Sequence, residues 1–333
     1  MQKIIDKHLY KKSLISYLLL PLSFVYSAIL ILRRKLHSGG YRSRCKIISV
    51  GNIVSGGSGK TPITIFLAKH LQIQGKKVAV SHRGYKGKFE NENKLISDEN
   101  KVFDLAQDAG DETYLLTSKL AGIPVIAGRD RKKSIQILEA KFPKLEYIIL
   151  DDSFQHLKVQ HDFDFVVFNA IGGIGNGFVL PAGILRESLS ALKYADYIVF
   201  NGKGESPVQI QKFNKPILKG GYKIKQFSDV KGNKIKPDGK LALLSGIGLP
   251  KSFENTIHEA GLHFEKHFRF PDHYDFKKKG VIKQIFAEVK LGKIDFLLTT
   301  EKDYAKLQFI EHDLLLAIVE VEFVLENKEL LKL

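Results

Sequence analysis

One segment, residues 46–62 (KIISVGNIVSGGSGKTP), most narrows the range of folds open to this chain. It begins as a short apolar run typical of a β-strand and continues as a glycine-rich loop. It then reaches Gly-Lys-Thr and Pro62, where a helical pattern begins. Proline is tolerated in the first turn of a helix because the N–H groups there have no intrahelical partner. Strand, glycine loop and helix in this order predict a phosphate-binding loop of the P-loop type.

Each residue type in this loop has a physical reason. Glycines let backbone N–H groups approach an anion closely, and the following helix N-terminus adds free donors and partial positive charge. Lys60 would reach the β- and γ-phosphates, and the Thr61 hydroxyl would bind Mg²⁺. The strict pattern requires glycine at position 54, where this chain has Val54, so a glycine-rich turn with a chance Gly-Lys-Thr is the alternative. The residues assigned to nucleotide binding are Val54, Ser55, Gly56, Gly57, Ser58, Gly59, Lys60 and Thr61.

Length and composition bound the other possibilities. The 333 residues suffice for two domains or for one large domain with an appendage, and a hydrophobic share of 44% allows a proper core. The single cysteine, Cys45, excludes an internal disulfide framework. The net charge of +16 fits nucleic acid, an anionic membrane or acidic substrates. We expect no nucleic acid, because the sequence shows neither a known binding module nor a basic stripe with interleaved aromatics.

An uncharged, mostly apolar segment lies near the N-terminus at residues 14–32, with Lys11-Lys12 before it and Arg33-Arg34-Lys35 after it. As a helix it would be roughly 28 Å long, which is close to the thickness of a bilayer's hydrocarbon core. Pro21 would kink this helix. Spanning the bilayer, lying in its interface and packing on the protein all remain open. We expect membrane association, and we place the nucleotide site that follows in the cytoplasm.

Acidic residues occur at two further places where an α/β sheet would carry function. The apolar run 146–150 leads straight into Asp151 and Asp152, which is typical of the acidic residue that organises Mg²⁺ opposite a P-loop. Asp111 and Glu112 stand at the start of a predicted helix. There they would serve as helix-capping charges or, near a bound triphosphate, would hold Mg²⁺ or accept a proton.

Two loops and a change in composition also bear on function and domain organisation. The loop 82–87 (HRGYKG) follows a predicted strand. The glycine-dense stretch 172–183 precedes Arg186 and Glu187 and indicates either a ligand site or an ordinary long loop. From about residue 205 the chain is rich in Lys and Gly, and a second α/β unit opens at residue 241. The predicted division is a membrane-associated helix over 1–35, a P-loop core over 36–205, a β-rich linker over 206–240 and a smaller α/β domain over 241–333.

Pattern alone indicates a Mg-nucleotide site and leaves a kinase, a GTPase switch and an ATP-driven ligase open. No N-K-x-D guanine motif follows the P-loop, which disfavours a GTPase.

The sequence closely resembles the tetraacyldisaccharide 4'-kinase family, the lipid A 4'-kinases of Gram-negative bacteria. The resemblance rests on the N-terminal helix and on collinear motifs over nearly the whole chain: VGNIVSGGSGKTP, SHRGYKGK, AGDE, GRDR, ILDDSFQH, GNGFVLPAGILRES, FPDHYDF and TTEKDYAKL. The family also has a residue other than glycine at the position of Val54. Two departures from the usual pattern are Ser153 in place of glycine and His82 inserted between Ser81 and Arg83; the second puts the role of the 81–85 loop in doubt.

The resemblance implies an α/β fold: a P-loop NTPase-like sheet with helices on both faces, a smaller C-terminal α/β domain that closes over the active site, and a membrane-associated N-terminal helix. It implies transfer of the γ-phosphate of ATP, with Mg²⁺, to the 4'-hydroxyl of a tetraacyldisaccharide 1-phosphate, a late step of lipid A biosynthesis. The implied location is the cytoplasmic face of the bacterial inner membrane. The expected partners are the lipid substrate and the membrane surface, with no required protein partner.

Chemistry and resemblance together imply roles for the site residues. Asp111 is the expected general base, assisted by His273, since a carboxylate with an ordinary pKa of about 3.9 is a weak base at neutral pH. Lys60, Arg131 and Arg186 are expected to meet phosphate charge. The expected metal ligands are Thr61, Glu112, Asp151 and Asp152, and the expected substrate-site residues are Tyr85, Gln155, His156 and Glu187. The alternative function is a membrane-tethered P-loop NTPase that acts as a switch or assembly factor without a small-molecule acceptor.

Overall fold

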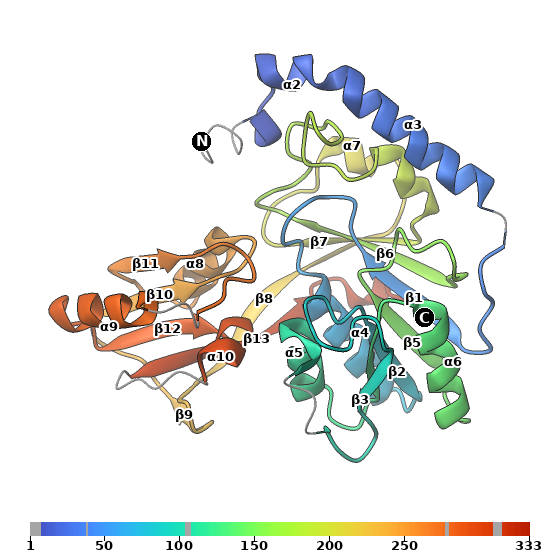
Figure 1. Cartoon of the computed structure of the whole chain (residues 1–333). Helices are drawn as coiled ribbons and strands as arrows, with labels where there is room; N and C mark the ends of the chain where they lie inside the picture. The colour runs from blue at the N-terminus through green and yellow to red at the C-terminus, as the bar shows by residue number, and fades with distance from the viewer. Residues whose placement is uncertain (1–7, 38, 104–107, 277–279, 309–314) are drawn as a thin grey trace. The chain divides into compact units, whose positions relative to one another are not determined.

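The computed structural model describes residues 8–37, 39–103, 108–276, 280–308 and 315–333. The chain forms two compact units, one of Met1–Gly221 with Leu325–Leu333 and one of Tyr222–Val324 (Figure 1). The boundary at residue 221 lies inside the stretch 206–240 that the sequence assigns to a linker. Two long strands, β8 (Ile217–Ser228) and β13 (Leu316–Leu325), run across the boundary.

The first unit is built on a mostly parallel sheet in the order β8-β7-β6-β1-β5-β2-β4-β3. β1 lies in the middle and pairs in parallel with both β5 and β6. Among the strands described in this order, β3 alone joins its neighbour, β4, in antiparallel fashion. The strands are β1 (Lys46–Gly51), β2 (Val78–His82), β3 (Lys94–Ser97), β4 (Val125–Ala127), β5 (Tyr147–Asp151), β6 (Phe163–Asn169) and β7 (Tyr197–Asn201).

Helices cover both faces of this sheet, which is why its central strands are apolar at nearly every position. α6 (Arg131–Lys141) packs in one cluster with Ile47 and Ile148. Ile48 and Ile149 point to the opposite face and are also fully buried. α4 (Lys60–Ile73) connects β1 to β2, in the opposite lateral direction to α6, which connects β4 to β5, so a right-handed crossover places α4 on that other face. α5 (Asp111–Lys119) lies between β3 and β4 and packs against α4. This is the α/β arrangement predicted from the sequence.

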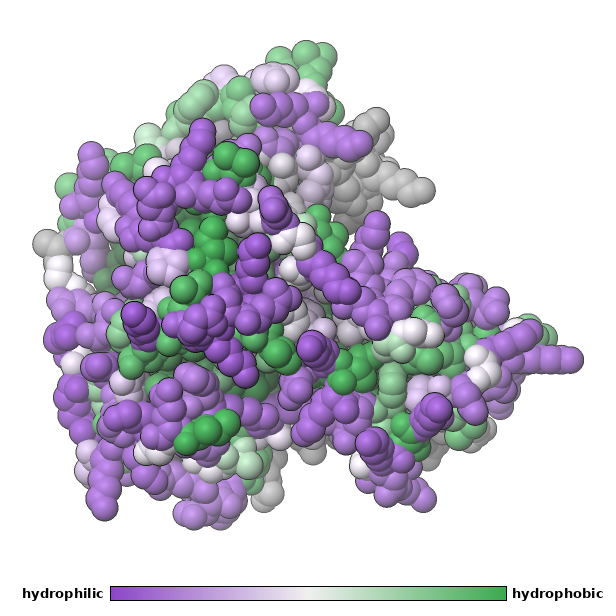
Figure 2. Space-filling view, turned by 180° about the vertical axis from the view of Figure 1, so that it is seen from behind, coloured by the Kyte–Doolittle hydropathy of each residue, from purple (hydrophilic) through white to green (hydrophobic). Residues whose placement is uncertain are grey.

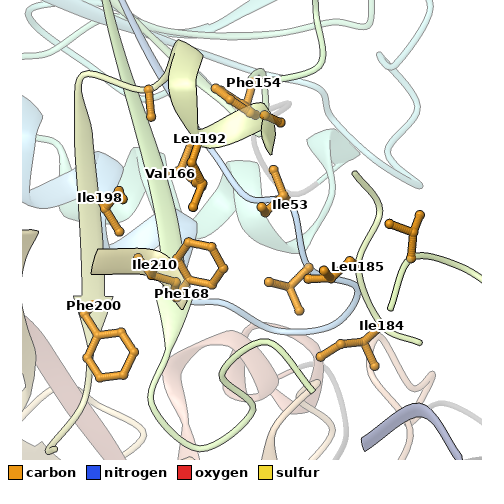
Figure 3. Packing of buried hydrophobic residues seen from close by; sticks show 14 residues of the cluster. Ile53, Phe154, Val166, Phe168, Ile184, Leu185, Leu192, Ile198, Phe200 and Ile210 are labelled. Carbon is orange, nitrogen blue, oxygen red and sulfur yellow. The ribbon is translucent and has the colours of Figure 1, made fainter. Parts of the chain in front are cut away.

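A second apolar cluster supports the loops beyond the sheet, and Figure 3 shows its members. It joins β6 and β7 to a 3₁₀ turn (Leu189–Tyr194), to the short α7 (Val208–Gln211) and to three loop segments. Ile53, Phe154 and Leu185 come from these three loops and are all buried. The loop after β1, the loop after β5 and the 172–187 loop therefore share one core.

The N-terminal hydrophobic segment forms two helices, α2 (Leu14–Leu18) and α3 (Leu20–Leu36), and the break falls just before Pro21. Their polarity is inverted with respect to an ordinary surface helix. Ser16 and Ser23 are buried, whereas many large apolar side chains are exposed. Figure 2 shows hydrophobic atoms along the upper edge of the view, where Figure 1 places α2 and α3. Among the described residues, no helix combines the length and hydrophobicity needed to cross a membrane.

The second unit is a smaller parallel sheet in the order β11-β10-β12-β13, with apolar clusters on two sides. β9 pairs with the end of β8 in antiparallel fashion. Its elements are β9 (Lys234–Ile235), β10 (Leu241–Ser245), α8 (Pro250–Glu259), β11 (Lys266–Arg269), α9 (Val281–Leu291), β12 (Phe296–Thr300) and α10 (Glu301–Leu307). A last 3₁₀ turn, Lys328–Leu330, belongs to the first unit.

Candidate active site

The glycine-rich loop joins the end of β1 to the start of α4, as its sequence predicts. Gly59 is the N-cap of α4 with φ of +84°, a left-handed conformation that favours glycine. Inside the loop, the side-chain amide of Asn52 donates to Ser58 Oγ over 2.8 Å. Val54 forms a bridge with Leu185, and its side chain is buried in the cluster of Figure 3. A valine therefore fits at position 54 because the backbone is paired there and the side chain faces the core.

Two carboxylates at the end of β5 lie against the start of α4. The Thr61 hydroxyl donates to Asp151 Oδ2 over 3.0 Å, and Lys60 Nζ lies 3.4 Å from Asp152 Oδ1. Burial raises the pKa of Asp151. Burial acts in the same direction on Asp152, but the neighbouring cations Lys60 and Arg186 outweigh it and lower the pKa of that carboxyl. Asp152 thus carries the anionic charge that Lys60 balances.

The departure at Ser153 is accommodated without strain. Its hydroxyl donates to the Leu150 carbonyl over 2.9 Å, and its N–H donates to the Val50 carbonyl over 3.1 Å. The turn places its left-handed residue at Asp152, with φ of +52°, so position 153 does not need glycine.

The loop after β2 touches the start of α5, main chain against main chain. The N–H of Lys88 donates to the Asp108 carbonyl over 2.8 Å. A Cβ on Gly87 would stand 2.3 Å from the carbonyl carbon of Ala109, so only glycine fits at position 87. This contact brings together the RGYKG and AGDE motifs and fixes the turn that carries Asp111 and Glu112.

His82 is the last residue of β2 and stays in regular register with Ala127 of β4. It is therefore an ordinary strand residue and does not form a bulge. Its ring is buried and reaches α5, where Nε2 lies 3.2 Å from Glu112 Oε2 and Nδ1 lies 2.8 Å from the Thr113 hydroxyl.

Arg131 begins α6 and is buried beneath the ends of the central strands. Its guanidinium donates to the main-chain carbonyl of Asp151 and, over 3.2 Å, to Ser81 Oγ. Burial lowers the pKa of Arg131 to about 10, and the carboxylates of Asp151 and Asp152 oppose that shift. The structure brings Arg131 to the predicted site, where it holds the end of β5 through the Asp151 carbonyl.

Arg186 reaches the P-loop through pairing between segments far apart in the sequence. The N–H of Arg186 donates to the Ile53 carbonyl over 2.7 Å, and the N–H of Ser55 donates to the Ile184 carbonyl over 2.8 Å. Arg186 is half-buried and is one of the cations that act on Asp152. It is thus well placed to meet phosphate charge.

Glu187, expected to contact substrate, has its carboxylate taken up by the protein. Arg34 of α3 donates from Nε and Nη2 to its two oxygens over 2.7 and 3.0 Å. Arg34 also donates to the Phe154 carbonyl over 3.1 Å and lies over the Phe154 ring. No local pattern signals this pair beyond the basic flank of the apolar segment.

The other substrate candidates of the first unit line the same edge. The side-chain amide of Gln155 donates to the Asn52 carbonyl over 2.7 Å and so ties the loop after β5 to the P-loop. Burial, reinforced by nearby Arg131, lowers the pKa of His156 to about 4. Tyr85 is 45% exposed, with Arg83 and Lys86 against its ring.

His273 belongs to the second unit, in the loop after β11. It has φ of +57°, its N–H donates to the Gly246 carbonyl over 3.3 Å, and its Nε2 lies 3.4 Å from Lys302 Nζ. Lys302 also lies 3.1 Å from Asp272 Oδ1. Lys302 was not selected from the sequence, although it stands in the TTEKD motif directly after β12.

Comparisons with known proteins point to a single family. The family model described as Tetraacyldisaccharide-1-P 4'-kinase, LpxK, matches residues 15–333. The chain belongs to this family. A tetraacyldisaccharide 4'-kinase of Desulfotalea psychrophila is 34% identical over 89% of this chain and 89% of its own. One of Halothermothrix orenii is 30% identical over 94% and 90%. The crystal structure of LpxK from Aquifex aeolicus, in a complex with ATP, matches with a TM-score of 0.73 and 27% identity over 95% of this chain and 96% of that one.

Membership of the LpxK family confirms the predicted kinase, a phosphotransferase of lipid A biosynthesis, and its P-loop fold.

Proposed function

We propose that the loop 52–61 binds the phosphates of ATP and that Asp111 accepts the proton of the acceptor hydroxyl. In the family reaction, the γ-phosphate passes to the 4'-hydroxyl of a tetraacyldisaccharide 1-phosphate. The observation that carries the proposal is the convergence of four residues at the start of α4: Lys60, Thr61, Asp151 and Asp152. Arg186 is attached to the same loop because its N–H donates to the Ile53 carbonyl. ATP is the nucleotide of the solved LpxK structure from Aquifex aeolicus.

The reaction requires little covalent chemistry from the protein. The 4'-oxygen forms a bond to the γ-phosphorus, the bond between that phosphorus and the bridging oxygen of ADP breaks, and the hydroxyl proton goes to the base. Catalysis then comes from positioning and from positive charge around the transferring group. Lys60 and Arg186, which both act on Asp152, supply that charge, and Arg131 supports the turn that carries Asp151 and Asp152.

The residues at the end of β5 fit Mg²⁺. They offer hard oxygen donors, and Mg²⁺ is usually held by one or two carboxylates together with substrate phosphates and water. Within the described parts of the chain, no three acidic, histidine or cysteine side chains form a ready metal cage. Thr61, Asp151, Asp152 and Glu112 would hold it, and it would neutralise charge on the phosphates.

Asp111 is the proposed base because it opens α5 within the turn fixed by the contact between Gly87 and Ala109. His273 is proposed to share the proton load. Within its own unit, His273 is held by the Gly246 carbonyl and faces the Lys302 ammonium. An ammonium group donates only, so His273 Nε2 accepts and is not the atom that carries the ring proton there.

A membrane surface is proposed for α2 and α3, at the cytoplasmic face of the inner membrane. Ser23 accepts from the Ala182 N–H over 3.0 Å and donates to the Val179 carbonyl over 2.8 Å, so α3 is attached to the first unit through its polar side. Leu18, Leu22 and Phe24 are left facing outward. Such a contiguous exposed apolar surface with basic flanks suits a lipid interface, where a tetraacylated substrate resides.

The direct test supplies purified protein with labelled ATP and the tetraacyldisaccharide 1-phosphate. We expect label in the lipid, and Asp111→Ala should reduce turnover by about 10²–10⁴-fold with nearly unchanged ATP affinity. A switch-type NTPase would release labelled phosphate without labelling the lipid and would tolerate Asp111→Ala. Unlabelled lipid beside an active control kinase would refute the proposed assignment.

A further inference from the structure

His82 is surrounded by partners from two segments that both carry family motifs. Its Nδ1 lies 2.8 Å from the Thr113 hydroxyl and 3.0 Å from the N–H of Gly84, and its Nε2 lies 3.2 Å from Glu112 Oε2. The residue is 3% exposed. Its position at the end of β2 makes it part of the sheet, so the ring connects a rigid strand to the first turn of α5.

The hydrogen bonds fix which ring nitrogen carries the proton. The backbone N–H of Gly84 donates only, so Nδ1 must accept. Thr113 Oγ1 lies 2.8 Å from the same nitrogen, so its hydroxyl also donates and shares the single lone pair of Nδ1 with the Gly84 N–H. The proton of the ring therefore lies on Nε2, which donates to the carboxylate of Glu112.

We propose that His82 is a positioning residue that aims the carboxylate of Glu112 into the nucleotide site. Glu112 has several rotatable bonds, and its side chain is 30% exposed. A donor anchored in β2 restricts it, and the pair of bonds to Gly84 and Thr113 holds that donor in place. Groups that orient metal ligands in this way commonly affect metal affinity by about 10–100-fold when they are removed.

The inference rests on the proposed role of Glu112 as a ligand of Mg²⁺. It also resolves the doubt about the 81–85 loop, because His82 keeps β2 regular and uses its ring to tie this loop to the AGDE turn. His82 therefore has two different hydrogen-bonding functions: Nδ1, near the backbone, accepts from Gly84, and Nε2, further out, donates to Glu112.

Two amide replacements separate these functions. In His82→Asn the side-chain oxygen can take the place of Nδ1, so the bond from Gly84 survives while the donor to Glu112 is lost. In His82→Gln the longer side chain carries its amide nitrogen to the region of Nε2 and keeps the donor. His70→Asn is the matched control, because His70 lies near the end of α4 and bonds only locally, to Gln74.

The experiment titrates Mn²⁺ into the protein bound to a non-hydrolysable ATP analogue and follows bound metal by electron paramagnetic resonance. The Mg²⁺ concentration for half-maximal kinase activity and the melting temperature are measured alongside. We expect His82→Asn to weaken Mn²⁺ binding by about tenfold or more. His82→Gln should restore most of the affinity, and His70→Asn should leave it unchanged.

The variant Glu112→Gln separates failure of this inference from failure of the proposed metal site. If Glu112→Gln weakens Mn²⁺ binding and His82→Asn then adds nothing in that background, the two residues act as one unit, as proposed. If Glu112→Gln weakens binding but neither His82 variant does, the inference is overturned while the metal site stands. If Glu112→Gln leaves binding unchanged, both are overturned. Equal losses in His82→Asn and His82→Gln, with lowered melting temperatures, would show a purely structural histidine and also overturn it.

Discussion

Arg34 on α3 and Glu187 in the loop beside the P-loop form a two-pronged ion pair, with side chains 12% and 6% exposed. Glu187 directly follows Arg186, and Arg34 also contacts Phe154 in the loop after β5. The N-terminal helix is therefore connected to two loops of the candidate active site through one guanidinium group.

Replacing Arg34 with Ala should destabilise the first unit by about 3–5 kcal/mol, because it leaves the Glu187 carboxylate buried without its partner. Urea unfolding measures this change. Arg33→Ala is the control, since Arg33 makes only an exposed contact of 3.4 Å to the Gln155 carbonyl. The double variant Arg34→Met with Glu187→Leu should recover much of the stability, because neither charge then stays unpaired. Equal stability of the two single-alanine variants would contradict this account.

Gly87→Ala should lower turnover by about 10²-fold, because a Cβ at this position would meet the Ala109 carbonyl at 2.3 Å and push the α5 turn away from its place. Steady-state kinetics and circular dichroism together show whether the loss occurs in a folded protein. Gly172→Ala is the matched control, since its added Cβ meets nothing closer than 3.9 Å. Normal turnover in Gly87→Ala would mean that the RGYKG loop does not position Asp111 and Glu112.

The pH dependence of stability should carry a contribution from His156. Burial lowers its pKa from 6.5 to about 4 in the folded chain, so between these values the unfolded chain binds the additional proton. Stability therefore falls as the pH drops from about 6.5 towards 4, and it is unaffected by this group above that window. His156→Asn should flatten the slope of unfolding free energy against pH, whereas His37→Asn, at an exposed position, should not. An unchanged slope in His156→Asn would contradict the assignment.

Local sequence pattern was sufficient to predict the site residues that directly follow a strand. The glycine loop, Lys60 and Thr61 follow β1, and Asp151 and Asp152 follow β5, so strand, turn and helix signals place them without knowledge of the fold. The central position of β1 between β5 and β6 then brings the two sets together. The fold class was predictable for the same reason, since continuous apolar strands alternating with helices indicate a covered parallel sheet.

The remaining contacts depend on pairing between distant segments, which no local pattern encodes. Arg186 reaches the P-loop because Ile53 and Ser55 bond to residues of the 184–186 segment. Glu187 looked available for substrate, but a partner more than a hundred residues away occupies both of its oxygens. The sequence indicates a linker over 206–240 because β8, although buried at Leu218 and Ser228, is partly buried or exposed over residues 221–227, which resembles a polar loop in sequence.

The inverted polarity of α2 and α3 leads to a prediction about lipid binding. Leu18, Leu22 and Phe24 are 71%, 59% and 69% exposed, and changing all three to Gln removes apolar surface without touching the buried Ser23 bonds. We expect this variant to partition onto vesicles containing anionic lipid at least tenfold less than the unchanged chain, because each inserted side chain contributes about 1 kcal/mol or more. Ile73→Gln is the control, since Ile73 is 85% exposed at the end of α4. Raising the salt concentration should weaken binding of the unchanged chain, since Lys11, Lys12 and Lys35 flank the apolar surface. Vesicle sedimentation gives the partition coefficients, and equal coefficients for the triple variant and the unchanged chain would show that α2 and α3 do not meet the lipid.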